Sequence, residues 1–350
     1  MAEYVGYVGT YTKQESKGVY QFTLDTDNKE LKDVKLAAEL GNPTYVTVSD
    51  DHKNLYAVTK EGDNGGVTAF AIHEETRDLT KLNTQTAAGS PPCHVSTDHE
   101  NSTVVTANYH TTNIVSYLTN EDGSLNPATS VVAHEGTGPH ERQEKPHMHY
   151  AGFTPDEKYV IAIDLGSDRV ITYEADEGKL IEVQVFNTTP GSGPRHITFH
   201  PNKKYAYVMT ELSSEVLVLH YNEEVGSFSE QQSVATIPED FHETNDGSAI
   251  HVSSDGQFVY AGNRGHNSIA VYKVDQDTGK LTFIEWTSTE GNWPRDFVLD
   301  PSEEFLIATN QKSNTMTLFD RDKATGKLSL VQSEVQVPEP VCVKFIGGVK

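Results

Sequence analysis

The sequence GPRHITFHP at positions 193–201, followed by YAYVMTE at 205–211, contains the pattern from which the fold is predicted. Apolar side chains alternate with others through Ile197 and Phe199, and again through Ala206 and Val208. This alternation is typical of strands that bury one face. The residues between the two runs are polar and begin with Pro201, as expected of a tight turn. The two runs therefore predict a β-hairpin.

Hairpins of the same kind recur along the whole chain. Their first strands begin at positions 46–56 residues apart, namely Pro43, Pro92, Met148, Pro194, Ser248, Pro294 and Pro340. A short polar loop, a third strand, a tight turn and a fourth strand follow each hairpin. The turns DTGK at 277–280 and ATGK at 324–327 carry glycine where a positive φ is expected. Four short strands in a unit of about 50 residues are typical of a β-propeller blade, so the sequence predicts an all-β fold.

The two ends of the chain together complete one such unit. The first strand-like block, YVGT at 7–10, matches a second strand, and the missing first strand is found as PVCVKFI at 340–346. We therefore expect the C-terminal strand to join the N-terminal blade, which closes the ring and leaves no exposed sheet edge there. Six whole units and one split unit predict a seven-bladed propeller of four-stranded antiparallel blades. No linker interrupts the repeat, so a single domain over residues 1–350 is expected.

Composition narrows the classes of partner. The formal net charge of −24 disfavours binding to nucleic acid and to anionic membranes, and no apolar run approaches the length of a membrane span. The first residues enter a strand pattern without the basic and apolar regions of a signal peptide, which favours a cytoplasmic location. Two cysteines imply no disulfide framework. We expect a monomer or a weak homodimer.

Charged residues interrupt the repeat at two equivalent positions, just after the start of the first strand and just past the end of the second. Because these strands are antiparallel, both positions lie on one face of the propeller, where the first strand lines the channel. The charged residues at or beside these positions in neighbouring blades are His147, His149, Arg195, Glu211, Arg264 and Arg295. This group is mainly cationic and suits an anionic substrate, because arginine binds carboxylate and phosphate through paired hydrogen bonds.

Structural roles compete with this interpretation. Glu211 and Arg264 are also expected to form a salt bridge between blades. His147 and His149 are two residues apart on an extended segment, so their side chains are expected to face the same side and to be capable of binding zinc. No third ligand stands at a diagnostic spacing, so we expect no metal. Two insertions, at 133–147 and 237–246, are either solvated loops or walls of a binding cleft.

Several short blocks carry a resemblance to a known family. They are YVGTY at 7–11, ANYH at 107–110, PHMH at 146–149, GPRH at 193–196, NRGHNS at 263–268 and GNWPRD at 291–296. In this order they resemble the seven-bladed β-propeller lactonase family, which includes bacterial cytoplasmic 6-phosphogluconolactonases and fungal carboxymuconate lactonising enzymes. The resemblance implies hydrolysis of 6-phospho-D-glucono-1,5-lactone to 6-phosphogluconate, a step of the pentose phosphate pathway, without a cofactor.

The resemblance also implies catalytic residues, which fall on His147, Arg195, Glu211 and Arg264. Glu211 or His147 is the expected general base, and the two arginines are expected to stabilise the oxyanion or hold the phosphate. Substrate-binding roles are expected for Arg295, His149 and His196, although His196 also suits a plain hydrogen-bonding role.

Three other functions stay open at this point. The first is a lactonase or lactonising cyclase that acts on another anionic substrate. The second is a Ca²⁺-dependent lactonase whose ligands would be Glu211, Asp164, Asn263 and Asn310. The third is a non-catalytic propeller that binds other molecules.

Overall fold

The hairpin at 193–211 forms as predicted. Strand β16 (Pro194–Phe199) pairs antiparallel with β17 (Tyr205–Thr210), and Ile197 lies opposite Val208. A hydrogen bond closes the turn: the amide of Lys203 donates to the carbonyl of His200 at 2.9 Å. Lys203 itself adopts a left-handed φ of 64°. A turn of this kind hydrogen-bonds its own backbone groups and holds the two strands in register, and packing within the four-stranded sheet stabilises the pair.

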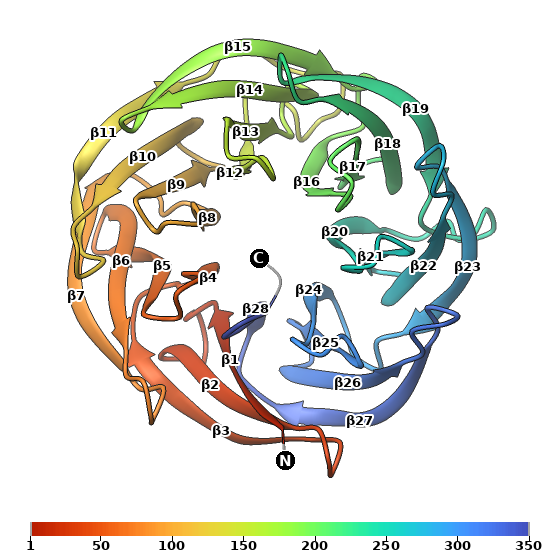
Figure 1. The fold of residues 1–350 in the computed structure, drawn as a ribbon, viewed down its shortest axis with the longest axis horizontal. Coiled ribbons are helices and arrows are strands. Elements are labelled where there is room, and N and C mark those ends of the chain that lie inside the picture. Colours follow the sequence, from red (N-terminus) through yellow and green to blue (C-terminus); the bar gives the residue numbers. More distant parts are fainter. Residues whose placement is uncertain (1, 349–350) are drawn as a thin grey trace.

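The computed structural model describes residues 2–348, and within that range it contains seven four-stranded antiparallel sheets arranged in a ring around a channel (Figure 1). From the channel outward, the first four sheets are β28 (Pro340–Phe345), β1 (Glu3–Thr10), β2 (Gly18–Asp25), β3 (Glu30–Glu39); β4 (Val46–Val48), β5 (Asn54–Glu61), β6 (Asn64–Ile72), β7 (Leu79–Ala88); β8 (His94–Thr97), β9 (Thr103–Asn108), β10 (Asn113–Thr119), β11 (Leu125–Ala133); and β12 (Met148–Phe153), β13 (Tyr159–Asp164), β14 (Arg169–Asp176), β15 (Lys179–Asn187). The other three are β16, β17, β18 (Glu215–Asn222), β19 (Ser227–Ala235); β20 (Asp246–Val252), β21 (Phe258–Arg264), β22 (Ser268–Val274), β23 (Leu281–Ser288); and β24 (Pro294–Leu299), β25 (Phe305–Asn310), β26 (Thr315–Arg321), β27 (Leu328–Gln336). The seven-bladed propeller predicted from the repeat is confirmed.

The C-terminal strand closes the ring. Strand β28 pairs antiparallel with β1, so that Val343 lies opposite Val8 and Phe345 opposite Gly6. The phenyl rings of Phe345 and Phe22 meet edge to face, with centroids 5.3 Å apart. The first and last strands therefore share one blade, as the unmatched ends of the sequence predicted. Within residues 2–348 no helix has the length and apolarity that crossing a bilayer requires.

Apolar side chains fill the spaces between neighbouring blades. Around the closing blade, for example, Phe22 and Phe345 pack with Val298 and Ile307 of the preceding blade. Tyrosines on the second strands add a recurring polar contact. The hydroxyl of Tyr207 donates at 2.8 Å to the carbonyl of Gly279, which lies in the turn between β22 and β23 of the following blade. Such buried hydroxyls have a partner and therefore tie one blade to the next without a desolvation penalty.

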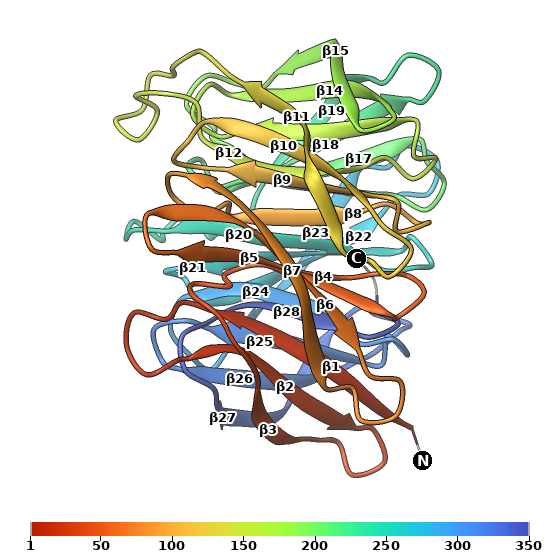
Figure 2. The same cartoon turned by 90° about the vertical axis from the view of Figure 1, so that its left-hand side faces the viewer.

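The innermost strands carry a bulge near their start, which the sequence pattern did not predict. In β12, β16 and β24 the pairing skips one residue, which is His149, Arg195 and Arg295 respectively. A bulge residue has no partner opposite it, and its side chain is turned out of the regular alternation. The repeated bulge thus directs one side chain per blade toward the channel at the same depth. Figure 2 shows the insertion between β11 and β12 at the opposite face of the ring from the two termini.

Candidate active site

One carboxylate and three arginines form the centre of the site. Glu211 follows β17, and its amide donates to the carbonyl of Gly193 at 2.7 Å. Carboxylate atom Oε2 lies 3.0 Å from Arg264 Nη2 and 3.2 Å from Arg195 Nε. The other oxygen, Oε1, pairs with Arg142 Nη2. The predicted contact between Glu211 and Arg264 is therefore present, within a larger network.

The charges in this network fix its protonation. Burial by itself raises the pKa of Glu211, but attraction to the guanidiniums of Arg264, Arg195 and Arg142 outweighs burial and holds the pKa well below its ordinary value. Glu211 is therefore ionised at neutral pH. Burial, together with repulsion from Arg264, lowers the pKa of Arg195 to about 10, so this guanidinium stays charged as well. Three cations around one anion leave the site with excess positive charge.

The chain encloses a cavity of about 380 Å³ beside this network, at the channel mouth where the second strands end. We call it the arginine cavity. The charged and aromatic residues that define it are Tyr11, Lys13, Lys60, Tyr109, Arg142, His149, Glu211, Arg264 and Arg295. Its volume falls in the range of small-molecule sites. Among the described residues, Lys13, Lys60 and Arg295 have no ion-pair partner, so their charges are available to an anion.

Arg295 is held by weak contacts only. Its guanidinium lies over the ring of Tyr11, 5.3 Å from the centroid, and its Nη1 is 3.4 Å from Oε1 of Gln311. Arg195, by contrast, is 3% exposed and supports Glu211 from beneath the cavity wall. The arginines predicted from the repeat therefore divide into one that lies under the site and two, Arg264 and Arg295, that line it.

The two histidines of the PHMH block both contact Tyr109, but only His149 lines the arginine cavity. The bulge in β12 turns His149 into the arginine cavity, whereas His147 precedes the strand and stacks on Tyr109, with ring centroids 4.0 Å apart. Nδ1 of His147 donates to the carbonyl of Tyr109 at 2.8 Å, and its Nε2 lies 3.0 Å from Glu144 Oε1. His147 therefore has both nitrogens engaged behind the wall.

His149 is the histidine in contact with the cavity. Its Nδ1 is buried and has no hydrogen-bond partner among residues 2–348. Burial and the charge of Arg195 hold its pKa well below the ordinary value, so the imidazole is neutral at physiological pH. A neutral imidazole can accept a proton, which makes His149 a candidate base.

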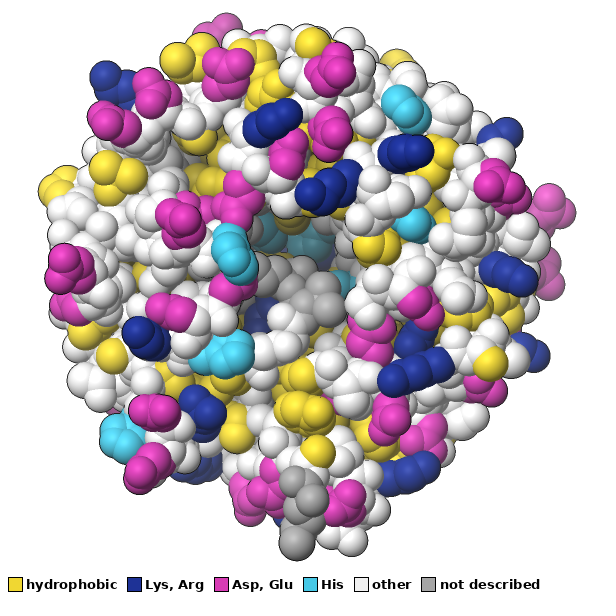
Figure 3. Space-filling view, viewed as in Figure 1, with side chains coloured by type: hydrophobic (Ala, Val, Ile, Leu, Met, Phe, Trp, Pro, Cys, Tyr) yellow, Lys and Arg dark blue, Asp and Glu magenta, His cyan; other side chains and the backbone are white. Residues whose placement is uncertain are grey.

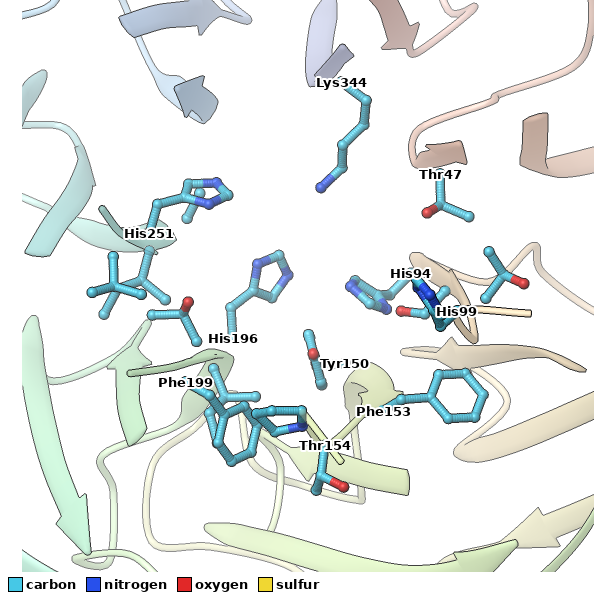
Figure 4. A pocket seen from close by; sticks show the side chains of 18 of the residues that line it. Thr47, His94, His99, Tyr150, Phe153, Thr154, His196, Phe199, His251 and Lys344 are labelled. Atoms are coloured by element: carbon cyan, nitrogen blue, oxygen red, sulfur yellow. The ribbon is translucent and has the colours of Figure 1, made fainter. Parts of the chain in front are cut away.

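His196 lies in a different place from the one predicted. It comes one residue after the bulge of β16, and its ring lines a second cavity at the other mouth of the channel (Figure 4). His149 and His196 meet edge to face, with centroids 5.2 Å apart, so the two rings are in contact although they line different cavities. Arg195, one residue before His196, pairs instead with Glu211 beneath the arginine cavity.

Sequence reasoning missed Arg142. It lies in the insertion at 133–147, and besides Glu211 it binds Asp246 of the second insertion, with Nη1 and Oδ1 3.0 Å apart. The only sequence evidence for a role of this segment was the length of the two insertions. That length indicated a possible cleft wall but not which side chain would reach the site.

Two of the oxygens expected to bind Ca²⁺ have other partners. Asp164 Oδ1 accepts from the amide of His147 at 2.8 Å, and Asn263 Oδ1 accepts from the hydroxyl of Thr236 at 2.8 Å. Asn310 Oδ1 is buried without a partner among the described residues, while its Nδ2 donates to the carbonyl of Thr289 at 3.2 Å. These side chains fasten strand ends to neighbouring loops. In the described part of the chain, no three His, Cys, Asp or Glu side chains are grouped as metal ligands.

Comparison with known proteins gives consistent matches over the whole chain. The sequence model of the family described as "Lactonase, 7-bladed beta-propeller" matches residues 5–345. The chain is 55% identical over 346 residues to a 6-phosphogluconolactonase of Bacillus subtilis, covering 99% of each chain. A crystal structure of a Lactobacillus plantarum protein is 43% identical with a TM-score of 0.95, covering 98% of this chain and 99% of that one. The periplasmic gluconolactonase of Pseudomonas aeruginosa is 30% identical with a TM-score of 0.93, covering 98% and 99%.

Proposed function

Because this chain belongs to the seven-bladed β-propeller lactonase family, we propose that it hydrolyses 6-phospho-D-glucono-1,5-lactone to 6-phosphogluconate in the arginine cavity. The observation that carries this proposal is the presence of three cations without an ion-pair partner, Lys13, Lys60 and Arg295, in a protein of net charge −24. Positive charge concentrated in one cavity of an acidic protein attracts an anionic substrate such as a sugar phosphate. The name of the Bacillus subtilis relative supports the same substrate.

In the proposed reaction, a water oxygen attacks C1 of the lactone and its proton passes to a base. The negative charge that develops on the carbonyl oxygen is stabilised by hydrogen-bond donors, and the bond between C1 and the ring oxygen then breaks as the ring oxygen takes up a proton. We assign the donors to the guanidiniums of Arg264 and Arg142, which Glu211 holds in position. Lys13, Lys60 and Arg295 hold the phosphate.

We assign the base to His149, in place of the two candidates expected from the sequence. Glu211 is a weak proton acceptor, because three guanidiniums stabilise its ionised form. His147 lies behind Tyr109, outside the cavity lining. His149 is neutral and reaches the cavity, and a phosphate dianion that enters beside it raises its basicity by offsetting the charge of the arginines. A phosphorylated substrate is also consistent with a cytoplasmic location, which we propose.

A panel of lactones tests this function. Initial rates are measured for 6-phosphogluconolactone, for unphosphorylated glucono-δ-lactone and for a carboxylated muconolactone, with wild-type protein and with Arg295→Gln. We expect kcat/KM to favour the phosphorylated lactone, and we expect Arg295→Gln to reduce this preference at least about tenfold by raising KM, since a charge-assisted contact contributes about 1.5–3 kcal/mol. Equal turnover of both gluconolactones, unaffected by Arg295→Gln, would instead assign a gluconolactonase. Turnover of the muconolactone alone would assign a cyclase.

A further inference from the structure

A second cavity, of about 730 Å³, opens at the other mouth of the channel and has no part in the proposed reaction. We call it the histidine cavity, and the residues that define it are Tyr45, His94, Tyr150, His196, His251 and Lys344. Figure 3 shows this mouth as a hollow in the face that Figure 1 presents. The rings of Tyr45, His94 and Tyr150 are in contact, with successive centroids 4.4 Å apart. These three rings line the histidine cavity and none of them lines the arginine cavity.

Lys344 is a buried cation that makes no ion pair within residues 2–348, although its charge interacts with the carboxylate of Asp296 in the same wall. It lies on β28, is 7% exposed, and extends its ammonium group into the cavity (Figure 4). Among the described residues it has no hydrogen-bond or ion-pair partner, and its Nζ lies 5.2 Å from the ring centroid of Tyr45. The carboxylate in the same wall, Asp296, makes no ion pair with it and instead accepts from the amide of Val343 at 2.8 Å. A buried ammonium of this kind is stabilised by an anion that pairs with it.

The histidines provide neutral hydrogen-bonding groups around this ammonium. Nε2 of His196 is buried and has no partner within residues 2–348. Nδ1 of His94 accepts from the amide of Ala151 at 3.3 Å, which leaves the N–H at its Nε2 as a donor toward the cavity. Burial is the main cause that lowers the pKa of His94, His196 and His251. Neutral imidazoles both donate and accept hydrogen bonds, so they suit hydroxyl groups rather than a second negative charge.

We propose that the histidine cavity binds a small polyhydroxylated monocarboxylate, a sugar acid, whose carboxylate pairs with Lys344 and whose hydroxyls bond His94, His196 and His251. One ammonium matches one negative charge. The acidic residues Asp50, Asp156, Glu157 and Asp296 also line the cavity, so a ligand with more than one negative charge is disfavoured. The hydroxyls of Thr47 and Thr198 line the cavity as further partners for the body of the ligand, and the ring of Tyr150 provides an apolar face. This site is independent of the reaction proposed for the arginine cavity.

Isothermal titration calorimetry with D-gluconate tests the proposal, with D-glucose as the uncharged control and inorganic phosphate as a competitor. We expect saturable binding of gluconate, no binding of glucose, and no displacement by phosphate at equal concentration. Lys344→Met keeps the aliphatic stem and is expected to weaken Kd by about tenfold or more. Arg264→Met removes a cation of the arginine cavity and is expected to leave Kd unchanged.

A second variant protects the test against misfolding, because Lys344 belongs to the strand that closes the ring. His196→Phe keeps the ring shape and removes no hydrogen bond seen among the described residues, so it is expected to melt like the wild type and to weaken gluconate binding severalfold. The proposal is overturned if gluconate does not bind, if phosphate displaces it, or if Arg264→Met abolishes binding while Lys344→Met and His196→Phe retain it.

Discussion

Replacing Glu211 by glutamine removes the carboxylate that pairs with Arg195, Arg264 and Arg142, of which only Arg142 has a second carboxylate partner, Asp246. Arg195 and Arg264 have side chains only 4% and 5% exposed, so their charges lose a partner in a site with little solvent, whereas Arg142 is 37% exposed and is screened by water. Breaking a buried ion pair by removing one partner costs about 3–5 kcal/mol. We therefore expect Glu211→Gln to lower the unfolding free energy by about this amount and Tm by roughly 4–7 °C.

The pH dependence of this loss gives a sharper test. Because the pKa of Glu211 is depressed in the folded protein, its contribution to stability is complete above its unfolded pKa of about 4.3 and is lost as pH falls toward the folded value. The difference in unfolding free energy between wild type and Glu211→Gln should therefore be constant between about pH 6 and about pH 8, and it should shrink below about pH 4. Denaturant melts at several pH values measure this difference.

Two control variants separate the charge effect from a change of shape. Asp246→Asn removes a pair to the half-exposed Arg142 and should cost only about 0–1 kcal/mol. Adding Arg195→Gln to Glu211→Gln removes one uncompensated charge, so the double variant should be more stable than Glu211→Gln alone. If Glu211→Gln melts like Asp246→Asn at pH 7, or if the double variant is the less stable one, the carboxylate does not hold this network together.

Three further outcomes are expected. His149→Asn should lower kcat by a factor on the order of 10²–10⁴ while His147→Asn keeps most of the activity, as measured by initial rates; the reverse order would return the base to His147. Turnover should survive exhaustive treatment with EDTA, and loss of activity that Ca²⁺ restores would show a metal requirement. Deleting residues from Pro338 onward removes β28 and exposes an edge of β1, so the truncated chain should aggregate in size-exclusion chromatography; a cooperative melt at the wild-type temperature would contradict the role of β28.

The blades were predictable from the sequence because their signals are local. Alternation through Ile197 and Phe199 and a polar turn at Pro201 determine a hairpin within about 20 residues. Because the same pattern recurs along the chain, it can be recognised even where a single copy is irregular. Ring closure was predictable for a related reason, since a second strand at the N-terminus and a first strand at the C-terminus each lack a partner elsewhere.

The site was only partly predictable, because its geometry depends on features with no periodic signal. Alternation alone gives no reason for His149 but not His147 to line the arginine cavity; β12 has a bulge at His149, and bulges leave no clear mark in composition. The corresponding bulge in β16 lies at Arg195, which pairs with Glu211, whereas the next residue, His196, lines the histidine cavity. Arg142 lies in an insertion that has no counterpart in the other blades, so no repeat position could indicate its contact with Glu211.

The pairing of β1 with β28 also sets a time course for the newly made chain. The ribosome makes β1 long before β28, and at about 5–20 residues per second roughly 17–70 s separate the two. Until β28 has emerged, the N-terminal blade lacks its innermost strand, and the channel-side edge of β1 is open to other partners. Slow translation of the codons between these two strands would lengthen this exposure. The demand for chaperones should therefore depend on how quickly β28 follows β1.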